Sequence, residues 1–192
     1  MKDRAPRKNE SAVAPRARAA ITPALLVALA IGVLLRVAYL AQIRRLPFVD
    51  FPIIDGAEYV RWAHSILSGE LLWSDVPIHG PVYPYFLASM LALSGESMPF
   101  AIFSQLLLGA ASVVLIYRIA GRLFGRTVAV LAALIAATYT TFIYFEGLVL
   151  ASSLIVFLNL ALLDRLVALP KWPRARALVL PGLLLGLSIG TH

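Results

Sequence analysis

A small set of acidic side chains stands out in a chain that is otherwise rich in hydrocarbon. The stretch FPIIDGAEYVRWAHSILSG at 51–69 contains Asp55 and Glu58, and TTFIYFEGLVLASSL at 140–154 contains Glu146. Carboxylates can take a proton from an attacking hydroxyl, hold a divalent cation, or stabilise an oxocarbenium-like transition state. All three chemistries stay open at this level.

Asp55 precedes a run of good helix formers, and two interpretations are open for its carboxylate. It could cap the helix by accepting backbone N–H groups, or it could face the protein as a functional group. Helical spacing places Tyr59 and Ile66 on the side of Asp55, and Glu58 more to the other side. The polar face is acidic on balance, whereas helices that bind anionic headgroups are rich in Lys and Arg. This favours a carboxylate directed toward the protein.

Glu146 follows an apolar segment and lies in a connection of only a few residues. Its carboxylate is either solvated at the membrane surface or faces the helix bundle, where ionisable groups tend to mark function. Arg36, near the end of the first apolar segment, could extend to the interface, bind a lipid phosphate, or pair with Glu146. Arg44 and Arg45, just outside that segment, are either headgroup contacts or a phosphate clamp.

His79 lies in DVPIHGPVYPYF, where His-Gly-Pro and Tyr-Pro favour irregular backbone. The three histidines, at positions 64, 79 and 192, lack the spacing of metal ligands, and the absence of cysteine excludes thiolate sites and disulfides. No P-loop, dinucleotide fingerprint or nucleophile motif is present. The cofactor is therefore unknown, with a divalent cation held by carboxylates as an open alternative.

The elements that must position these residues are long apolar segments. The 192 residues are 60% hydrophobic and 14% charged, with a mean hydropathy of +0.85, whereas soluble domains carry about 25% charged residues. The apolar residues fall in segments of 16–22 residues, which can cross about 30 Å of hydrocarbon as helices. We expect spans at about 21–41, 99–120, 127–144, 148–163 and 177–192. The predicted fold class is all-α, a polytopic transmembrane helix bundle closely packed through small residues.

The first loop, residues 42–98, is predicted to be extracytoplasmic and to carry amphipathic or interfacial helices. Its apolar stretch at 82–93 is too short to cross a bilayer. Thirteen of the seventeen basic residues fall on the side of the N-terminal arm, and seven of the ten acids fall on the other side. The positive-inside rule then places residues 1–20 in the cytoplasm. Their basic, Pro/Ala-rich composition predicts a disordered arm, and the short arm and lean loops favour a multi-pass protein of the plasma (inner) membrane. This distribution argues against interpreting the net charge of +7 as a sign of nucleic-acid binding, and the expected partners are membrane lipids and no nucleic acid.

The order of these features resembles the GT-C membrane glycosyltransferases. The likeness is strongest to family 39, with its protein O-mannosyltransferase-like, aminoarabinose-transferase-like and RgtA/B/C/D-like members. It rests on four motifs: Asp55-Gly-Ala-Glu-Tyr59-Val-Arg-Trp-Ala63, His79-Gly-Pro81-Val-Tyr83-Pro84, Leu123-Phe124-Gly125, and Glu146 outside the third span. The resemblance covers about residues 21–192, which would form the N-terminal part of a catalytic domain.

The resemblance implies transfer of a sugar from a polyprenyl-phosphate donor, on the non-cytoplasmic face, to an acceptor lipid, glycan or protein. It makes Asp55 the catalytic acid of the first loop and Glu146 the second acid, with Asp50 as the alternate for Asp55. The remaining expected roles are donor phosphate binding by Arg36, Arg44 and Arg45, and acceptor or sugar contact by Glu58, Tyr59, His79 and Tyr83.

Two other functions remain open. A transporter or lipid flippase usually carries mid-membrane charges and paired repeats, whereas 128–163 holds no charge except Glu146, and no repeat is visible. The chain also stops inside the apolar segment GLLLGLSIGTH, as a truncated fragment or an assembly subunit would. On that expectation the fragment alone would be inactive.

Overall fold

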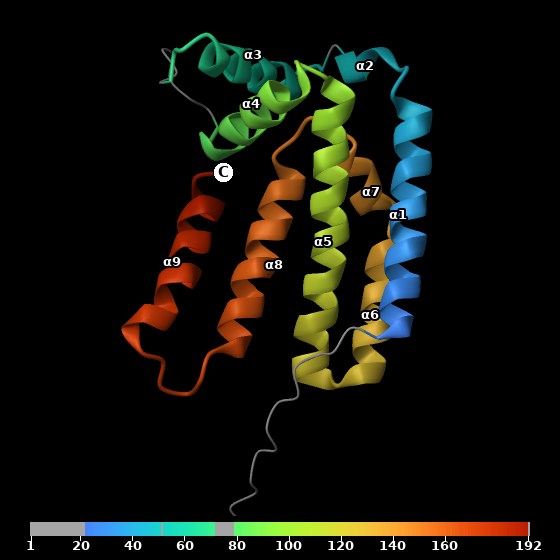
Figure 1. Ribbon diagram of the computed structural model, residues 1–192, viewed down its shortest axis with the longest axis vertical. Helices are drawn as coiled ribbons and strands as arrows, with labels where there is room; N and C mark the ends of the chain where they lie inside the picture. Colours follow the sequence, from blue (N-terminus) through green and yellow to red (C-terminus); the bar gives the residue numbers. More distant parts are fainter. Residues whose placement is uncertain (1–21, 51, 72–78, 192) are drawn as a thin grey trace, which may run out of the picture.

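The computed structural model describes residues 22–50, 52–71 and 79–191, and in these ranges the regular structure is entirely helical (Figure 1). The predicted all-α class is confirmed. The upright helices are α1 (Pro23–Ile43), α5 (Met98–Phe124), α6 (Arg126–Thr138), α7 (Thr140–Glu146), α8 (Ser152–Ala168) and α9 (Ala175–Ile189). The helices α2 (Pro47–Asp50), α3 (Asp55–Leu67) and α4 (Val82–Ser94) lie across one end of this bundle (Figure 1).

Within the described residues, two helices are long and apolar enough to span a membrane, α1 with 21 residues and α5 with 27. The helices α6 and α7 make a third candidate if they are counted as one span, although they are bent by 52° relative to each other. The uninterrupted span predicted at 127–144 is therefore broken, at Tyr139. The chain is a membrane protein with a helical bundle as its core.

The last two predicted spans are shifted along the chain. The helix α8 begins at Ser152, not near 148, and α9 ends at Ile189. With 17 and 15 residues, both are shorter than the about 20 residues that a straight crossing needs. The irregular turn at 147–151 separates α7 from α8, and this turn forms part of the site described below.

Small residues allow the central helices to approach closely, as the sequence predicts. Ala133 and Ala137 of α6 are fully buried against α1 and α5. A Cβ added at Gly32 of α1 would lie 3.1 Å from Cβ of Ala137, so this crossing has no room for a larger residue. Close backbone contact of this kind is how membrane helices associate.

The helix α4 has the short apolar form that the sequence predicts, and its core side is completely buried. Tyr83, Leu87 and Leu91 are at most 1% exposed and pack in one cluster with residues of α3 and α5. The backbone N–H of Val82 donates to the carbonyl of Gly190 at 2.9 Å, which joins the start of α4 to the end of α9. The α2–α4 layer is thus fixed to the bundle beneath it.

Candidate active site

The chain enters α3 through a strained turn directly before Asp55. Ile54 has a φ of 54°, a left-handed conformation that is costly for a β-branched residue and recurs beside functional sites. Ile54 occupies the N-cap position and no side chain caps the helix. The interpretation of Asp55 as a helix cap is therefore wrong: Asp55 is the first residue of α3, and its carboxylate is directed to His79 instead.

His79 lies between two carboxylates of the first turn of α3. Its Nε2 is 3.7 Å from Oδ1 of Asp55 and 3.8 Å from Oε2 of Glu58. These distances exceed a hydrogen bond but suit an ion pair when the imidazole is protonated. The side chains of Asp55 and Glu58 are 50% and 17% exposed, so each carboxylate is partly buried and still accessible to solvent. Three residues that the sequence assigned to the site are thus brought together.

Two tyrosines support this cluster from below. The ring of Tyr59 lies 5.0 Å from the His79 ring and meets Tyr83 edge-on at 4.7 Å between centroids. Burial raises the pKa of Tyr59, and the charges of Asp55 and Glu58 raise it further. Burial also holds the pKa of Tyr83 well above its usual value. Both phenols therefore stay protonated at neutral pH and can donate hydrogen bonds.

The cluster borders a cavity of about 210 Å³ between the α2–α4 layer and the bundle. Asp55, Tyr59 and His79 form one wall. The opposite wall comes from the turn before α8 and from the chain beyond α9, through Leu150, Ala151, Ser152, Ile155 and Thr191. A cavity where a few polar groups converge on apolar walls has the character of a small-molecule site.

Glu146 is buried and faces the bundle, which decides between the two interpretations of its position. Its two carboxylate oxygens accept from Nε and Nη2 of Arg36 at 2.7 and 2.8 Å, and both side chains are at most 7% exposed. Of the three roles open to Arg36, the structure shows the pair with Glu146. A two-pronged bond of this type is the strongest form of a guanidinium–carboxylate contact.

Arg36 also stabilises the break between α6 and α7. Its Nη1 donates at 3.2 Å to the carbonyl of Ala137, in the last turn of α6, and to the carbonyl of Gly32 in its own helix. Carbonyls at a helix end lack a partner within the helix, so they need a donor of this kind inside a membrane. The approach of Glu146 also requires Gly109, because a Cβ built there would overlap the Glu146 carboxylate.

Gln105 of α5 connects this pair to the cluster above it. Its Oε1 accepts from the Tyr83 hydroxyl at 2.6 Å, and its Nε2 donates to the carbonyls of Glu146 and Leu148 at 3.1 and 2.8 Å. One amide therefore fixes both Tyr83 and the turn that leads to the cavity wall. Sequence reasoning missed Gln105; the available signal was a single amide side chain in a long apolar segment.

The other predicted site residues lie at the edge of this arrangement. The side chains of Arg44 and Arg45 are exposed at the end of α1, on the same end of the bundle as the α2–α4 layer. Asp50, the alternate to Asp55, is the last residue of α2, and its side chain lies outside the described part of the structure. Within the described ranges, no group of three or more His, Cys, Asp and Glu residues is arranged to hold a metal ion.

Comparison with known families adds independent information. The family model described as dolichyl-phosphate-mannose-protein mannosyltransferase matches residues 78–191, which is more than half of the chain. The matched region contains His79, Tyr83, Gln105 and Glu146, and it begins after Asp55. No curated protein and no solved structure matches the chain.

Proposed function

This chain belongs to the dolichyl-phosphate-mannose-protein mannosyltransferase family, and we propose that it moves a sugar from a polyprenyl-phosphate donor to an acceptor hydroxyl on the non-cytoplasmic face. Membership makes the protein a membrane glycosyltransferase. The proposal adds the type of donor, the face of the membrane and the residues that act. The acceptor hydroxyl would belong to a lipid, a glycan or a protein.

The observation that carries the proposal is that Asp55 and His79 line one cavity, with Glu58 beside them at 3.8 Å from His79. In the reaction, the acceptor oxygen attacks the anomeric carbon of the donor sugar while Asp55 takes the acceptor proton. The bond between that carbon and the phosphate oxygen breaks, and the polyprenyl phosphate leaves with the electron pair. Glu58 stabilises the positive charge that develops on the sugar, and His79 holds the two carboxylates in place.

This scheme changes the role that the resemblance gave to Glu146. Both of its oxygens are occupied by Arg36, so it is poorly placed to accept a proton. We assign Glu58 as the second acid of the site, and Arg36 with Glu146 as the support of the adjacent turn. Arg44 and Arg45, exposed at the end of α1, would be the residues that bind the donor phosphate.

An apolar cavity beside the cluster supports a lipid-linked donor. It measures about 330 Å³ and is lined by Pro52, Ile53, Gly56, Tyr144, Leu148, Val149 and Leu150. Leu150 also lines the cavity of the acid cluster, so the two spaces adjoin. The first isoprene units of the donor would lie here, with the phosphosugar directed toward Asp55.

In this proposal the protein lies in the plasma (inner) membrane. The α2–α4 layer is on the non-cytoplasmic side, and residues 1–20 are a cytoplasmic arm. The turn between α5 and α6 and the loop between α8 and α9 lie at the end opposite the α2–α4 layer (Figure 1). Because the chain has no cysteine, single variants report sidedness directly. An impermeant maleimide added to whole cells should label Glu96→Cys and spare Trp172→Cys; the reverse pattern would overturn the orientation.

The catalytic assignment can be tested with dolichyl-phosphate-mannose supplied to the protein in liposomes. We expect Asp55→Asn to lower transfer at least about a hundredfold, which is the size of a general-base contribution. His79→Gln and Glu58→Gln should lower it less. The matched control is the second pair of a histidine and a carboxylate, His64 and Glu96, which lie 4.0 Å apart and are exposed outside the cavity.

The substitutions His64→Gln and Glu96→Gln should leave transfer unchanged. If Asp55→Asn retains transfer within a few-fold of the unsubstituted protein, Asp55 is not the base, and Asp50→Asn becomes the informative variant. If the unsubstituted protein transfers no mannose but Asp55→Asn weakens retention of the labelled donor, the site binds a lipid-linked sugar and the assigned sugar is wrong.

A further inference from the structure

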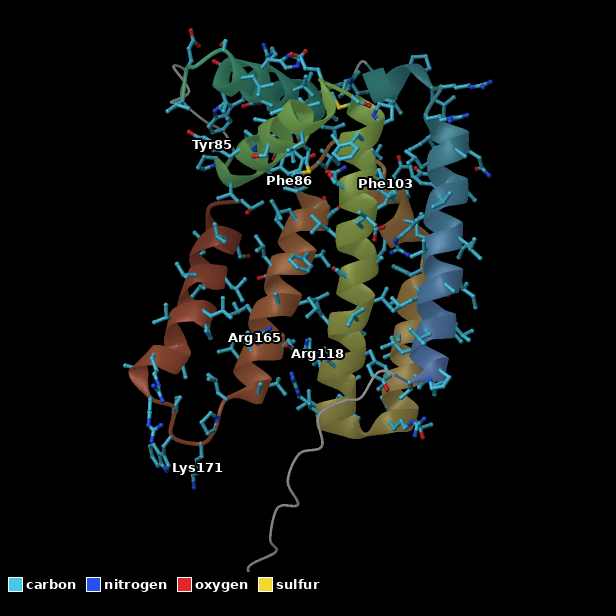
Figure 2. The ribbon with its side chains drawn as sticks, in the orientation of Figure 1. Tyr85, Phe86, Phe103, Arg118, Arg165 and Lys171 are labelled. Carbon is cyan, nitrogen blue, oxygen red and sulfur yellow. The ribbon has the colours of Figure 1, made fainter. Side chains whose placement is uncertain are left out.

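A second cluster of charges lies far from the proposed active site, between α5 and α8. Asp164 of α8 has a completely buried side chain and faces three guanidiniums. Arg122 donates to its carboxylate and to its backbone carbonyl. Arg118 Nη2 lies 3.0 Å, and Arg165 Nε 4.0 Å, from Oδ2 of the same carboxylate. Figure 2 shows Arg118 and Arg165 between the two helices, with Lys171 on the loop beyond them.

The charges in this cluster do not balance. Three guanidiniums face one carboxylate, which leaves two positive charges in excess, and no other carboxylate of the described residues forms an ion pair with them. Excess charge next to hydrocarbon is costly and calls for a counter-ion. The cluster is therefore incomplete as a purely structural ion pair.

The hydrogen-bond donors of two of these guanidiniums are also unused. Oδ2 of Asp164 accepts no hydrogen bond from the residues that the structure describes, so Arg118 is held by charge and not by a directed bond. Arg165 is likewise at ion-pair distance only. Neither guanidinium donates a hydrogen bond to any residue that the structure describes. Their side chains are 33% and 48% exposed, which leaves their N–H groups accessible from outside the bundle.

We propose that Arg118 and Arg165, positioned by Asp164, bind the phosphate of an anionic membrane lipid. A phosphodiester offers oxygens that match the donor geometry of two guanidiniums, and its negative charge offsets part of the excess. We assign the phosphate to a membrane lipid because both residues lie on helices of the bundle, toward the end opposite α2–α4 (Figure 2). The site is separate from the acid cluster, and it does not depend on the transfer reaction.

The test compares the chain in nanodiscs of phosphatidylcholine with and without phosphatidylglycerol. We expect phosphatidylglycerol to raise the unfolding temperature by several degrees, because a ligand that binds only the folded state stabilises it. The double variant Arg118→Gln/Arg165→Gln should lose this rise. The double variant Lys171→Gln/Arg174→Gln removes the same charge from exposed positions in the loop region and should keep it.

Measurements at high ionic strength distinguish a specific lipid site from nonspecific electrostatic attraction of anionic lipid. The rise should persist at high ionic strength, because exposed charges are screened within a few ångströms whereas partly buried ones are screened much less. Native mass spectrometry gives a second measurement, in which the unsubstituted chain should retain phosphatidylglycerol and Arg118→Gln/Arg165→Gln should not. The proposal is overturned if phosphatidylglycerol has no effect, if both double variants lose the rise equally, or if inorganic phosphate in phosphatidylcholine discs reproduces it.

Discussion

Glu146 and Asp164, the two buried carboxylates in the described part of the chain, lie toward opposite ends of the bundle and are neutralised in different ways. Glu146, near the proposed active site, meets one guanidinium. Nε and Nη2 of Arg36 donate to its carboxylate, and Nη1 donates to the carbonyl of Ala137. Asp164 meets three guanidiniums, and among the described residues only Arg122 donates a hydrogen bond to its carboxylate. The first pair is balanced and closed to solvent. The second is unbalanced and open on the side of Arg118 and Arg165.

The difference indicates two uses of the same chemistry. A closed, balanced pair holds the backbone in place: Arg36 and Glu146 fix the α6–α7 break and the turn that carries one wall of the cavity. An open cluster with excess charge has capacity for a ligand, because its donors are oriented but unsatisfied. We therefore expect the two regions to respond differently to the removal of their carboxylates and to the lipid that surrounds them.

The largest effect should come from neutralising one partner of the closed pair. Glu146→Gln leaves the Arg36 charge buried without compensation, and breaking a buried pair in this way costs about 3–5 kcal/mol. Unfolding by SDS in mixed micelles measures the loss. The double variant Arg36→Met/Glu146→Leu removes both charges and should recover part of the stability, while the Ala137 carbonyl still loses its donor. If the double variant is as unstable as Glu146→Gln, the pair is not what stabilises this region.

Much of the proposed active site could be predicted from the sequence. Asp55, Glu58, Tyr59 and His79 were assigned to one site, and the structure brings them together. The motif likeness carried that prediction, since helical spacing alone placed Glu58 on the side away from Asp55. The pair of Arg36 with Glu146 was one of three alternatives, because a single chain pattern gives no information on which distant groups meet.

The features that the sequence did not predict are tertiary in origin. The break at Tyr139 has no proline or glycine at the bend. The segment TYTT at 138–141 is less apolar than its neighbours, but it does not reveal that Arg36 of another helix satisfies the carbonyl freed there. Gln105 has no local motif, and its value comes from three partners on other segments. Asp164 contributed only to the charge count. In each case the deciding contact lies far away in the chain.

The open cluster should tolerate loss of its carboxylate better. Asp164→Asn keeps an acceptor for Arg122 and lets the two exposed guanidiniums turn outward, so we expect a loss of about 1.5–3 kcal/mol, the value of hydrogen bonds to a charged group. Phosphatidylglycerol should reduce this loss, whereas it should leave the loss in Glu146→Gln unchanged. Equal responses of the two variants to the lipid would remove the distinction between the regions. Unfolding in nanodiscs of defined composition provides the comparison.

A smaller effect should come from crowding the closed pair. Gly109→Ala places a methyl group against the Glu146 carboxylate, which cannot move away because Arg36 holds both of its oxygens. Overpacking of this kind costs about 1–3 kcal/mol. The control is Gly182→Ala in α9, where an added Cβ meets nothing within 4 Å. A stable Gly109→Ala protein would mean that Glu146 is held less rigidly than the structure indicates.

The smallest loss of stability should follow removal of the Tyr83 hydroxyl, although its effect should reach the active site. Tyr83→Phe deletes the bond to Gln105, and we expect a cost of about 1 kcal/mol because Gln105 keeps its two donated bonds. Gln105→Met removes all three bonds. Because the Tyr83 ring supports Tyr59, which in turn contacts His79, both variants should change the chemical shifts of the ring protons of His79 in NMR spectra. The exposed His64 is the internal control. If the signals of His79 stay unchanged while stability falls, Gln105 supports the bundle but does not position the site.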